Sequence, residues 1–226
     1  MIQAIIFDMD GTLLDTEKYY QIFWPKALEA FGHTMTKEQA LAMRSLGNPF
    51  GNSQFKAWFG DDLDVAAVRA KRKELMDPYV EKEGVRCKPG AVELLRELKK
   101  RGITTAVATA TNLPQAMKHL DAAGITGYFD KIISAHMVKE GKPSPDVYAY
   151  ACEQLGLRPE ECMAVEDAPN GVLSAYRAGC KVVMVPDETR PDEELSKCLL
   201  QQRITCWRYW NSWSDYCILF EGVLLF

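Results

Sequence analysis

The apolar residues of the chain change their spacing twice along its length. Residues 2–6 form a short, mostly apolar run rich in β-branched side chains, which predicts a buried strand. Residues 17–83 carry apolar positions near helical spacing and contain no convincing strand. From residue 89 to residue 185, helical and strand-like segments alternate. This alternation predicts an α/β fold, a Rossmann-like parallel sheet with helices on both faces, interrupted after its first strand by an all-α insertion.

The region 17–83 predicts three helices with recognisable signals at their ends. The first, at 18–31, contains Pro25, which should kink or restart it. Thr36 and Gln39 have the spacing of a capping box and predict a helix over residues 37–46. Residues 47–51 break the pattern, and Asp62 is the expected N-cap of a long helix that runs to residue 80.

The alternating region predicts shorter elements that are bounded by glycine and proline. The expected helices span residues 91–101, 113–123, 145–155 and 171–178, and the expected strands span 103–108, 131–134, 162–165 and 181–185. We therefore assign residues 1–16 and 84–197 to an α/β core domain and residues 17–83 to a helical domain.

The last 29 residues, 198–226, have a different composition from the rest of the chain. They hold three of the five tryptophans and three of the seven cysteines: Trp207, Trp210, Trp213, Cys198, Cys206 and Cys217. We interpret this segment as an atypical or altered C-terminus, such as a changed reading frame would produce. The alternative is a divergent edge strand.

Composition and charge exclude several classes of function. A net charge of −4 without a basic block argues against a nucleic-acid partner. No apolar run approaches 18 residues, so we expect no membrane span, and the N-terminal residues show no secretory signal. Seven cysteines at irregular spacing, without a CxxC pair, suit reduced thiols in a cytoplasmic protein. We expect a monomer, with a dimer as the alternative.

The candidate chemistry begins directly after the first strand. Asp8 and Asp10 are two residues apart, so they point to the same side of the extended chain. Two neighbouring carboxylates repel each other unless a cation or proton lies between them, and Mg²⁺ prefers such oxygen ligands. Gly11 permits a tight turn after them. A calcium loop is excluded because Thr12 and Tyr19 occupy positions where that motif needs oxygen ligands.

Further polar residues follow the later strands. In a doubly wound sheet, ligands collect at the carboxyl ends of the strands. The hydroxyl of Thr109 and the backbone amides of the turn that follows it could bind phosphate oxygens, although a threonine there is often an ordinary cap. Lys142, in a proline-rich loop, could offset phosphate and carboxylate charge, although a loop lysine is usually exposed. The candidates in these two loops and at the acidic doublet after the strand 162–165 are Thr109, Ala110, Thr111, Asn112, Lys142, Glu166 and Asp167.

Together these positions resemble a known family. The pair Asp8-x-Asp10, then Thr109, Lys142 and the doublet Glu166-Asp167, match in order the four motifs of the haloacid-dehalogenase-like superfamily of phosphotransferases. The phrases Phe-Asp-Met-Asp-Gly-Thr, Gly-Lys-Pro-Ser-Pro-Asp and Val-Glu-Asp-Ala-Pro-Asn-Gly resemble the branch that holds β-phosphoglucomutase and small sugar-phosphate phosphatases. The resemblance covers residues 2–197.

The resemblance implies a two-step phosphoryl transfer. Asp8 would attack phosphorus and form an aspartyl-phosphate, and Asp10 would act as the acid and then the base. Lys142 and Thr109 would stabilise charge on the transferring group. The implied Mg²⁺ ligands are Asp8, the backbone carbonyl of Asp10, Asp167 and, directly or through water, Glu166. Relatives that dehalogenate or cleave phosphonates lack an acid at the position of Asp10, so we set those reactions aside.

The helical insertion resembles the cap that selects the substrate in this family. Arg44 matches a cap arginine that binds the distal phosphate in mutase relatives, and the alternative is an arginine on a helix surface. Tyr20 replaces a histidine typical of mutases. We interpret the basic run 69–73 as a solvated helix face rather than a binding patch.

The function that follows from the resemblance is a Mg²⁺-dependent phosphatase acting on a small phosphorylated sugar or polyol. A β-phosphoglucomutase-like isomerase is the alternative, and a non-catalytic binding protein on the same scaffold is a third hypothesis. The sequence does not identify the substrate.

Overall fold

A sheet of five parallel strands lies at the centre of this computed structural model, which describes residues 2–200. The central strand is β1 (Ala4–Phe7), and its four residues are all buried. It pairs with β2 (Thr104–Thr109) on one side and β4 (Cys162–Glu166) on the other. The strands β3 (Lys131–Ser134) and β5 (Lys181–Met184) complete the order β3-β2-β1-β4-β5. The first strand therefore places its carboxyl end between those of β2 and β4.

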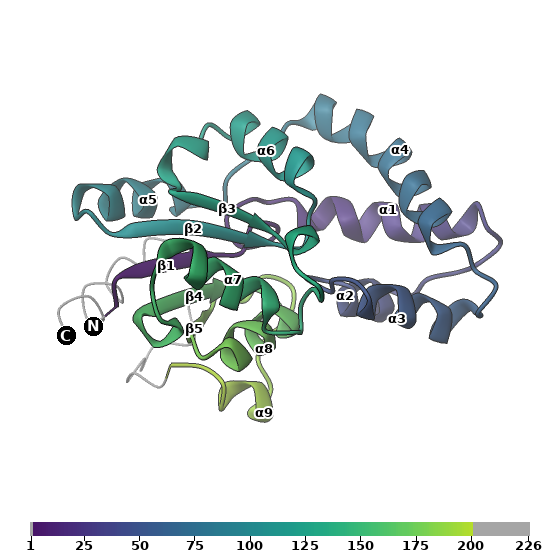
Figure 1. Ribbon diagram of the computed structural model, residues 1–226. Helices are drawn as coiled ribbons and strands as arrows, with labels where there is room; N and C mark the ends of the chain where they lie inside the picture. The colour runs from purple at the N-terminus through teal and green to yellow at the C-terminus, as the bar shows by residue number, and fades with distance from the viewer. Residues whose placement is uncertain (1, 201–226) are drawn as a thin grey trace.

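Helices cover both faces of the sheet (Figure 1). On one face, α5 (Ala91–Lys100) and α6 (Leu113–Ala122) pack against Ile5 and Phe7 of β1. On the other, α7 (Asp146–Leu155), α8 (Pro169–Ala178) and α9 (Glu193–Ser196) pack over Ala4 and Ile6. Alternate residues of one strand thus supply two cores, as strand geometry requires. The predicted α/β fold class is confirmed. Three short 3-10 turns lie at Thr126–Tyr128, Ala135–Met137 and Pro159–Glu161.

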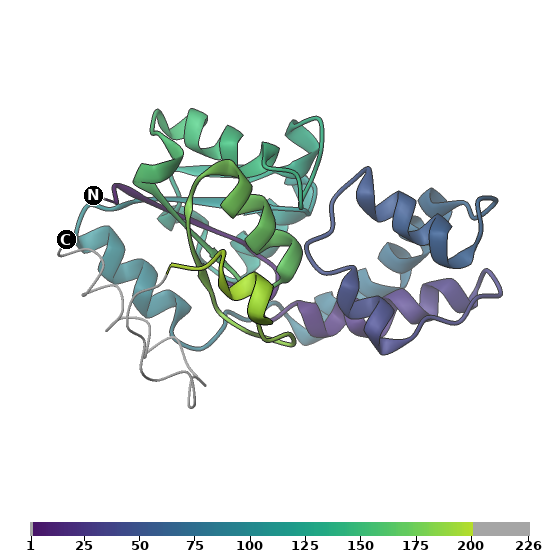
Figure 2. The ribbon, with the colours of Figure 1, turned by 90° about the horizontal axis from the view of Figure 1, so that it is seen from below.

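Residues 17–83 form four helices that lie beside the sheet rather than over either face (Figure 2). These are α1 (Glu17–Glu29), α2 (Lys37–Ala42), α3 (Phe50–Phe59) and α4 (Val65–Glu83). They share a separate apolar core that includes Trp24, Leu28, Phe55 and Val68. We call this group the helical region.

Backbone hydrogen bonds join the helical region to the sheet domain at one close contact. The amide of Gly47 donates to the carbonyl of Lys142 at 2.8 Å, and the amide of Gly141 donates to the carbonyl of Asn48 at 2.6 Å. A Cβ atom added to Gly141 would lie 2.7 Å from the Cα of Gly47, so neither position has room for a side chain. Glycine at both positions therefore lets the two loops touch.

Several predicted element ends hold and others do not. Thr36 and Gln39 form the predicted capping box, with each side chain bonded to the other's backbone amide. The prediction of Asp62 as the cap of the long helix was wrong. The helix α4 begins at Val65, and the Asp64 side chain accepts from the amide of Ala67 at 2.9 Å. Asp62 and Asp64 are two residues apart, and the backbone geometry decides which of them caps α4.

Two further predictions about the helical region were wrong in detail. The helix α1 continues through Pro25, so the prediction of a restart was wrong, whereas that of a kink stays a prediction. The helix predicted over 37–46 ends at Ala42, and an additional helix, α3, begins at Phe50, inside the predicted break at 47–51.

The C-terminal segment predicted to be atypical begins at Cys198, and residues 201–226 lie outside the described residues. The last described residue, Leu200, donates its amide to the carbonyl of Val182 at 2.8 Å. Across residues 2–200, no helix is both long and apolar enough to cross a membrane.

Candidate active site

Three buried carboxylates meet at the carboxyl ends of β1 and β4. Asp8 directly follows β1, Glu166 is the last residue of β4, and Asp167 follows it. One oxygen atom from each carboxylate lies within 4.8 Å of the others. We call Asp8, Glu166 and Asp167 the carboxylate triad. Residues 158 positions apart in the sequence come together because β1 and β4 are adjacent parallel strands.

Lys142 neutralises part of the negative charge of the triad. Its ammonium donates to Asp8 Oδ1 at 2.6 Å, to Glu166 Oε1 at 2.5 Å and to the carbonyl of Ala108 at 2.9 Å. The side chain is fully buried. Burial lowers the pKa of Lys142, but the carboxylates of Asp8 and Glu166 outweigh it, so the pKa is raised overall. Lys142 therefore remains charged, contrary to the alternative of an exposed loop lysine.

The buried charge of the triad favours uptake of a proton or of a further cation. Burial raises the pKa of Asp8 to about 8, although Lys142 opposes the shift. Burial likewise raises the pKa of Asp167 to about 7, against the opposing charge of Arg44. Asp8 Oδ2 is buried and has no hydrogen-bond partner among the described residues. An unpaired buried carboxylate oxygen beside two further carboxylates suits a hard divalent cation such as Mg²⁺.

Asp10 belongs to a different network from the triad. Its Oδ1 atom accepts from the Thr16 hydroxyl at 2.6 Å, and its Oδ2 atom accepts from the Thr111 hydroxyl at 2.8 Å. Both carboxylate oxygens are thereby held, and the side chain borders the cavity described below. The side chain of Asp10 is not in the triad, so the metal role predicted for this residue concerns only its backbone carbonyl and stays a prediction.

Gly11 makes the turn between Asp8 and α1 possible. Its φ is +86°, a conformation that side chains disfavour. An added Cβ would lie 2.2 Å from Asp167 Oδ2 and 2.8 Å from the Cγ of Glu17. Gly11 thus lets the loop after β1 lie directly against the acidic doublet after β4.

The loop after β2 forms a turn, and its predicted binding of phosphate stays a prediction. The Thr109 hydroxyl accepts from the amide of Thr111 at 3.0 Å. The Asn112 side chain accepts from the amide of Gln115 at 3.1 Å and so acts as the N-cap of α6. The oxygen of Asn112 is therefore already engaged, whereas the helix N-terminus behind it favours anions. The last residue of β2 and the three that follow it all border the cavity: Thr109, Ala110, Thr111 and Asn112.

A cavity of about 300 Å³ lies between the sheet domain and the helical region. Asp8, Asp10 and the loop after β2 border it from the sheet domain. Tyr20, Trp24 and Arg44 border it from the helical region. Lys142, Glu166 and Asp167 are fully buried and do not border it, although Lys142 donates to Asp8. The pocket therefore presents one carboxylate of the triad, together with Asp10, to any bound molecule.

The sequence pattern of the haloacid dehalogenase-like hydrolase family matches residues 2–179. The chain belongs to this family. The predicted resemblance is thereby confirmed, including its phosphoglucomutase-like branch. Hexitol phosphatase A of Escherichia coli is 34% identical over 183 residues, which cover 81% of this chain and 82% of that protein.

Two solved structures are also similar to this hydrolase. A mutant of CbbY from Rhodobacter sphaeroides in complex with xylulose-(1,5)bisphosphate has a TM-score of 0.70 and 30% identity, covering 82% of this chain and 87% of that one. A β-phosphoglucomutase described as putative, from Bacteroides vulgatus, has a TM-score of 0.73 and 28% identity, covering 87% and 81% of the two chains.

Arg44 of this hydrolase lies against the triad rather than on a helix surface. It is buried and forms an ion pair with Asp167 through its Nη2 atom. Its Nη1 atom donates to the Thr189 hydroxyl at 3.1 Å, and its Nε atom lies 3.8 Å from Glu17 Oε2. The alternative of a surface arginine is wrong. The predicted contact with a distal phosphate stays a prediction, and the structure commits this guanidinium to Asp167.

Several polar residues of the site were not predicted from the sequence. Thr16 and Glu17 follow the first motif within the same turn of chain and reach Asp10 and Arg44, and Tyr148 donates to Glu166 Oε1 at 2.6 Å. Thr16 could have been suspected from its nearness to the first motif. Tyr148 gives no such signal, because a helical tyrosine reads as an ordinary core residue.

The interpretation of residues 69–73 as a solvated face was wrong for three of its four basic members. Arg69, Arg72 and Lys73 border the cavity. Arg69 and Arg72 are three residues apart, which places them on the same side of α4, and Arg72 lies 4.3 Å from the ring centre of Trp24 on α1. A run of consecutive charges gave no sign of which side would face inward.

Proposed function

We propose that this hydrolase is a Mg²⁺-dependent phosphatase that cleaves a small phosphorylated sugar or polyol through an aspartyl-phosphate on Asp8. The observation that carries the proposal is the unequal state of the two Asp8 oxygens. Lys142 holds Oδ1, whereas Oδ2 is buried without a hydrogen-bond partner among the described residues. Asp8 also borders the cavity, so it is the triad carboxylate that a phosphate ester can reach.

The metal ligands in this proposal are Asp8, Asp167, the backbone carbonyl of Asp10 and, directly or through water, Glu166. When bound, Mg²⁺ supplies positive charge that offsets the carboxylates and the phosphate oxygens. The geometry that supports this assignment is the triad itself, with its oxygens within 4.8 Å of one another.

In the first step, a carboxylate oxygen of Asp8 forms a bond to phosphorus while the bond from phosphorus to the ester oxygen breaks. The departing sugar oxygen takes a proton from Asp10. In the second step, Asp10 removes a proton from water, whose oxygen attacks phosphorus and releases Asp8 and inorganic phosphate. Lys142 keeps Asp8 in place, and the hydroxyls of Thr16 and Thr111 orient Asp10.

The substrate class is supported by the size of the cavity and by the relatives. A volume of about 300 Å³ suits a small metabolite. One relative is named hexitol phosphatase, another from Thermotoga maritima is named phosphorylated carbohydrates phosphatase, and the CbbY structure holds a sugar bisphosphate. We infer that a sugar or polyol chain occupies the space between Asp10 and the helical region.

A β-phosphoglucomutase activity is the second candidate, favoured by the similarity to structures named as such mutases. Tyr20 argues against it, because a tyrosine stands where mutases carry a histidine. The Tyr20 hydroxyl lies 3.4 Å from the Thr111 hydroxyl, and burial raises its pKa, so it stays protonated. Comparing the glucose 1,6-bisphosphate-dependent interconversion of β-glucose 1-phosphate and glucose 6-phosphate with the release of inorganic phosphate separates the two activities.

The Asp8→Asn variant tests the proposed nucleophile. Asparagine keeps the shape of the side chain but removes the attacking carboxylate, so we expect phosphate release from a panel of sugar and polyol phosphates with Mg²⁺ to be abolished. Circular dichroism should show an intact fold. Asp61→Asn, in an exposed loop, is the matched control and should keep the wild-type rate. Appreciable turnover by Asp8→Asn would refute the assignment.

A further inference from the structure

Two arginines of α4 border the cavity from the side of the helical region. Arg69 and Arg72 lie on α4 (Val65–Glu83), whereas Asp8 and Asp10 border the same cavity from the sheet domain. A molecule whose phosphate ester lies at Asp8 therefore has the rest of its length in a space that contains both guanidinium groups.

Neither arginine is neutralised by the protein. Arg69 Nη2 donates to the side-chain oxygens of Asn48 at 3.1 Å and Asn52 at 3.3 Å, both of which are uncharged. The guanidinium of Arg72 lies 4.8 Å from the ring centre of Tyr20 and 4.3 Å from that of Trp24. Within residues 2–200, neither forms an ion pair, and the Nε atom of each is buried without a hydrogen-bond partner.

Other basic residues of α4 do have carboxylate partners. Lys71 Nζ lies 2.8 Å from Glu74 Oε1. Lys73, which also borders the cavity, forms an ion pair with Asp77, which borders it too. The absence of a carboxylate thus distinguishes the two cavity arginines from their neighbours on the same helix.

The unpaired charges make this end of the cavity favourable for an anion. Burying a cation without a counter-charge is costly. Burial and the nearby charge of Arg72 lower the pKa of Arg69 to about 10. Because Arg72 stacks on aromatic rings, its N–H groups remain free in the plane of the guanidinium, where they can bind a carboxylate or phosphate.

Arg44 does not serve this purpose in the structure. It is paired with Asp167 and hydrogen-bonded to Thr189, so its charge is already used beside the triad. The positive charges that remain available to a second anionic group of a bound molecule are therefore those of Arg69 and Arg72.

We propose that Arg69 and Arg72 bind a second anionic group of the substrate, a phosphate or a carboxylate, at the end away from the ester attacked by Asp8. This inference rests on the proposed phosphatase function and narrows its substrate class. The preferred substrates are sugar or polyol phosphates that carry an anion at both ends, such as bisphosphates and phosphorylated sugar acids.

Binding to matched ligands tests the proposal independently of turnover. The ligands are glucose 6-phosphate, glucose 1,6-bisphosphate and 6-phosphogluconate, titrated with Mg²⁺ into the Asp8→Asn protein by calorimetry. We expect this parent to bind at least one doubly anionic ligand about 10-fold or more tightly than glucose 6-phosphate, because hydrogen bonds between charged groups are the strong ones. The ligand that gains affinity identifies the second anion as a phosphate or a carboxylate.

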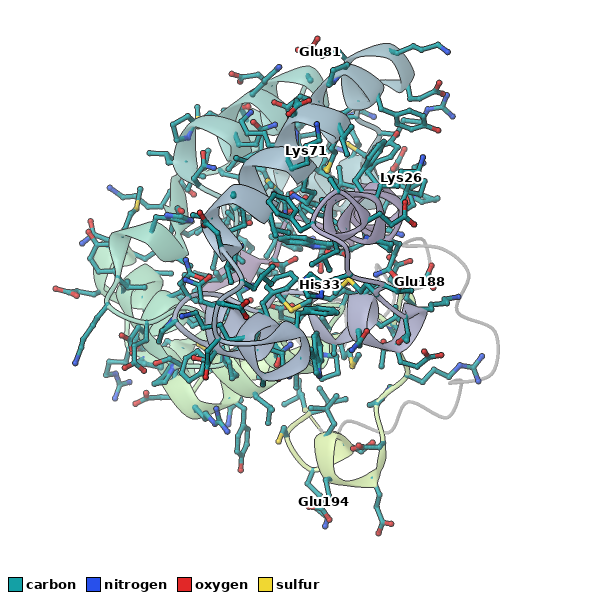
Figure 3. The ribbon with its side chains drawn as sticks, turned by 90° about the vertical axis from the view of Figure 1, so that its right-hand side faces the viewer. Lys26, His33, Lys71, Glu81, Glu188 and Glu194 are labelled. Carbon is teal, nitrogen blue, oxygen red and sulfur yellow. The ribbon has the colours of Figure 1, made fainter. Side chains whose placement is uncertain are left out.

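Arg69→Gln and Arg72→Gln, each made in the same parent, should remove this preference while leaving affinity for glucose 6-phosphate nearly unchanged. Lys71→Gln is the matched control, since it removes the same charge from α4. Lys71 is labelled in Figure 3 and does not border the cavity. It should keep the preference.

A parent without preference, or arginine variants that lose affinity for all three ligands by the same factor, would overturn the inference. Failure of the phosphatase proposal would look different. In that case the wild-type protein releases no phosphate from any ligand, while the binding preference and its loss in the arginine variants persist.

Discussion

Lys142 sets the charge balance at the centre of the site. Its ammonium and the guanidinium of Arg44 are two buried cations facing the three carboxylates of the triad. With all groups ionised, one negative charge is left over. In a buried setting that excess is relieved either by a proton or by a metal ion. We therefore expect protons and Mg²⁺ to compete for the carboxylates of the triad.

The pH dependence of stability follows from the raised pKa values of Asp8 and Asp167, about 8 and about 7. A carboxyl whose pKa is higher in the folded protein than in the unfolded chain takes up a proton on folding. Its contribution to the free energy of unfolding is complete at low pH and is lost as the pH rises through the pKa of the folded protein. We therefore expect the melting temperature of the metal-free protein, measured in EDTA, to fall from about pH 4 to about pH 8.

The Asp8→Asn variant provides the control for this slope, because asparagine does not titrate. Its melting temperature in EDTA should depend less steeply on pH than that of the wild type, whereas Asp61→Asn should leave the slope unchanged. A wild-type protein whose melting temperature rises over the same pH range would contradict the raised pKa values of Asp8 and Asp167 in the folded protein.

At the scale of elements, the contact between Gly47 and Gly141 is one of those that hold the helical region against the sheet domain. The loop between α2 and α3 and the loop before α7 meet through two backbone hydrogen bonds and a close glycine pair. Glycine here serves close approach, since neither residue has a positive φ. The cavity walls on the helical side keep their positions relative to Asp8 partly through this contact.

Replacing Gly141 with alanine should separate the two loops. The added Cβ would lie 2.7 Å from the Cα of Gly47, a backbone atom that cannot move away alone. We expect KM for sugar phosphates to rise several-fold with a smaller change in kcat, measured by steady-state phosphate release. Gly127→Ala is the control, because an added Cβ there meets no atom within 4 Å. Equal kinetics for the two variants would show that the glycine contact does not position the helical region.

The elements of the sheet domain were predictable because their signals are local. The strand at 131–134 has the predicted bounds, and the strand at 162–165 is extended only by Glu166. The helical region was harder, since whether Asp62 or Asp64 caps α4 depends on tertiary packing. The loop residues after strands were recognisable by position and by family resemblance. The inward direction of Arg69 and Arg72 was not, because a consecutive basic run lacks the spacing that marks a buried face.

At the scale of the whole molecule, a metal ion should act as a stabilising ligand. The triad joins residues from β1 and β4, so an ion bound there favours the folded chain only. At a concentration 100 times its Kd, such an ion adds about 2.7 kcal/mol to the free energy of unfolding. We expect MgCl₂ to raise the melting temperature at pH 8, measured by calorimetry, relative to NaCl of equal ionic strength.

The Asp167→Asn variant tests whether this stabilisation comes from the triad. Asparagine removes one carboxylate, so the Mg²⁺-dependent increase in melting temperature should be largely lost. An undiminished increase in this variant would place the ion elsewhere on the molecule.

The hydrogen bond from the amide of Gly47 to the carbonyl of Lys142 has a consequence for how molecules enter and leave the cavity. The backbone of Lys142 is tied to the helical region, while its ammonium is tied to Asp8. Parting the two loops to admit or release a molecule removes a restraint from the very peptide that carries this ammonium. Access to the interior and readiness of the nucleophile are thus mechanically linked through one amino acid.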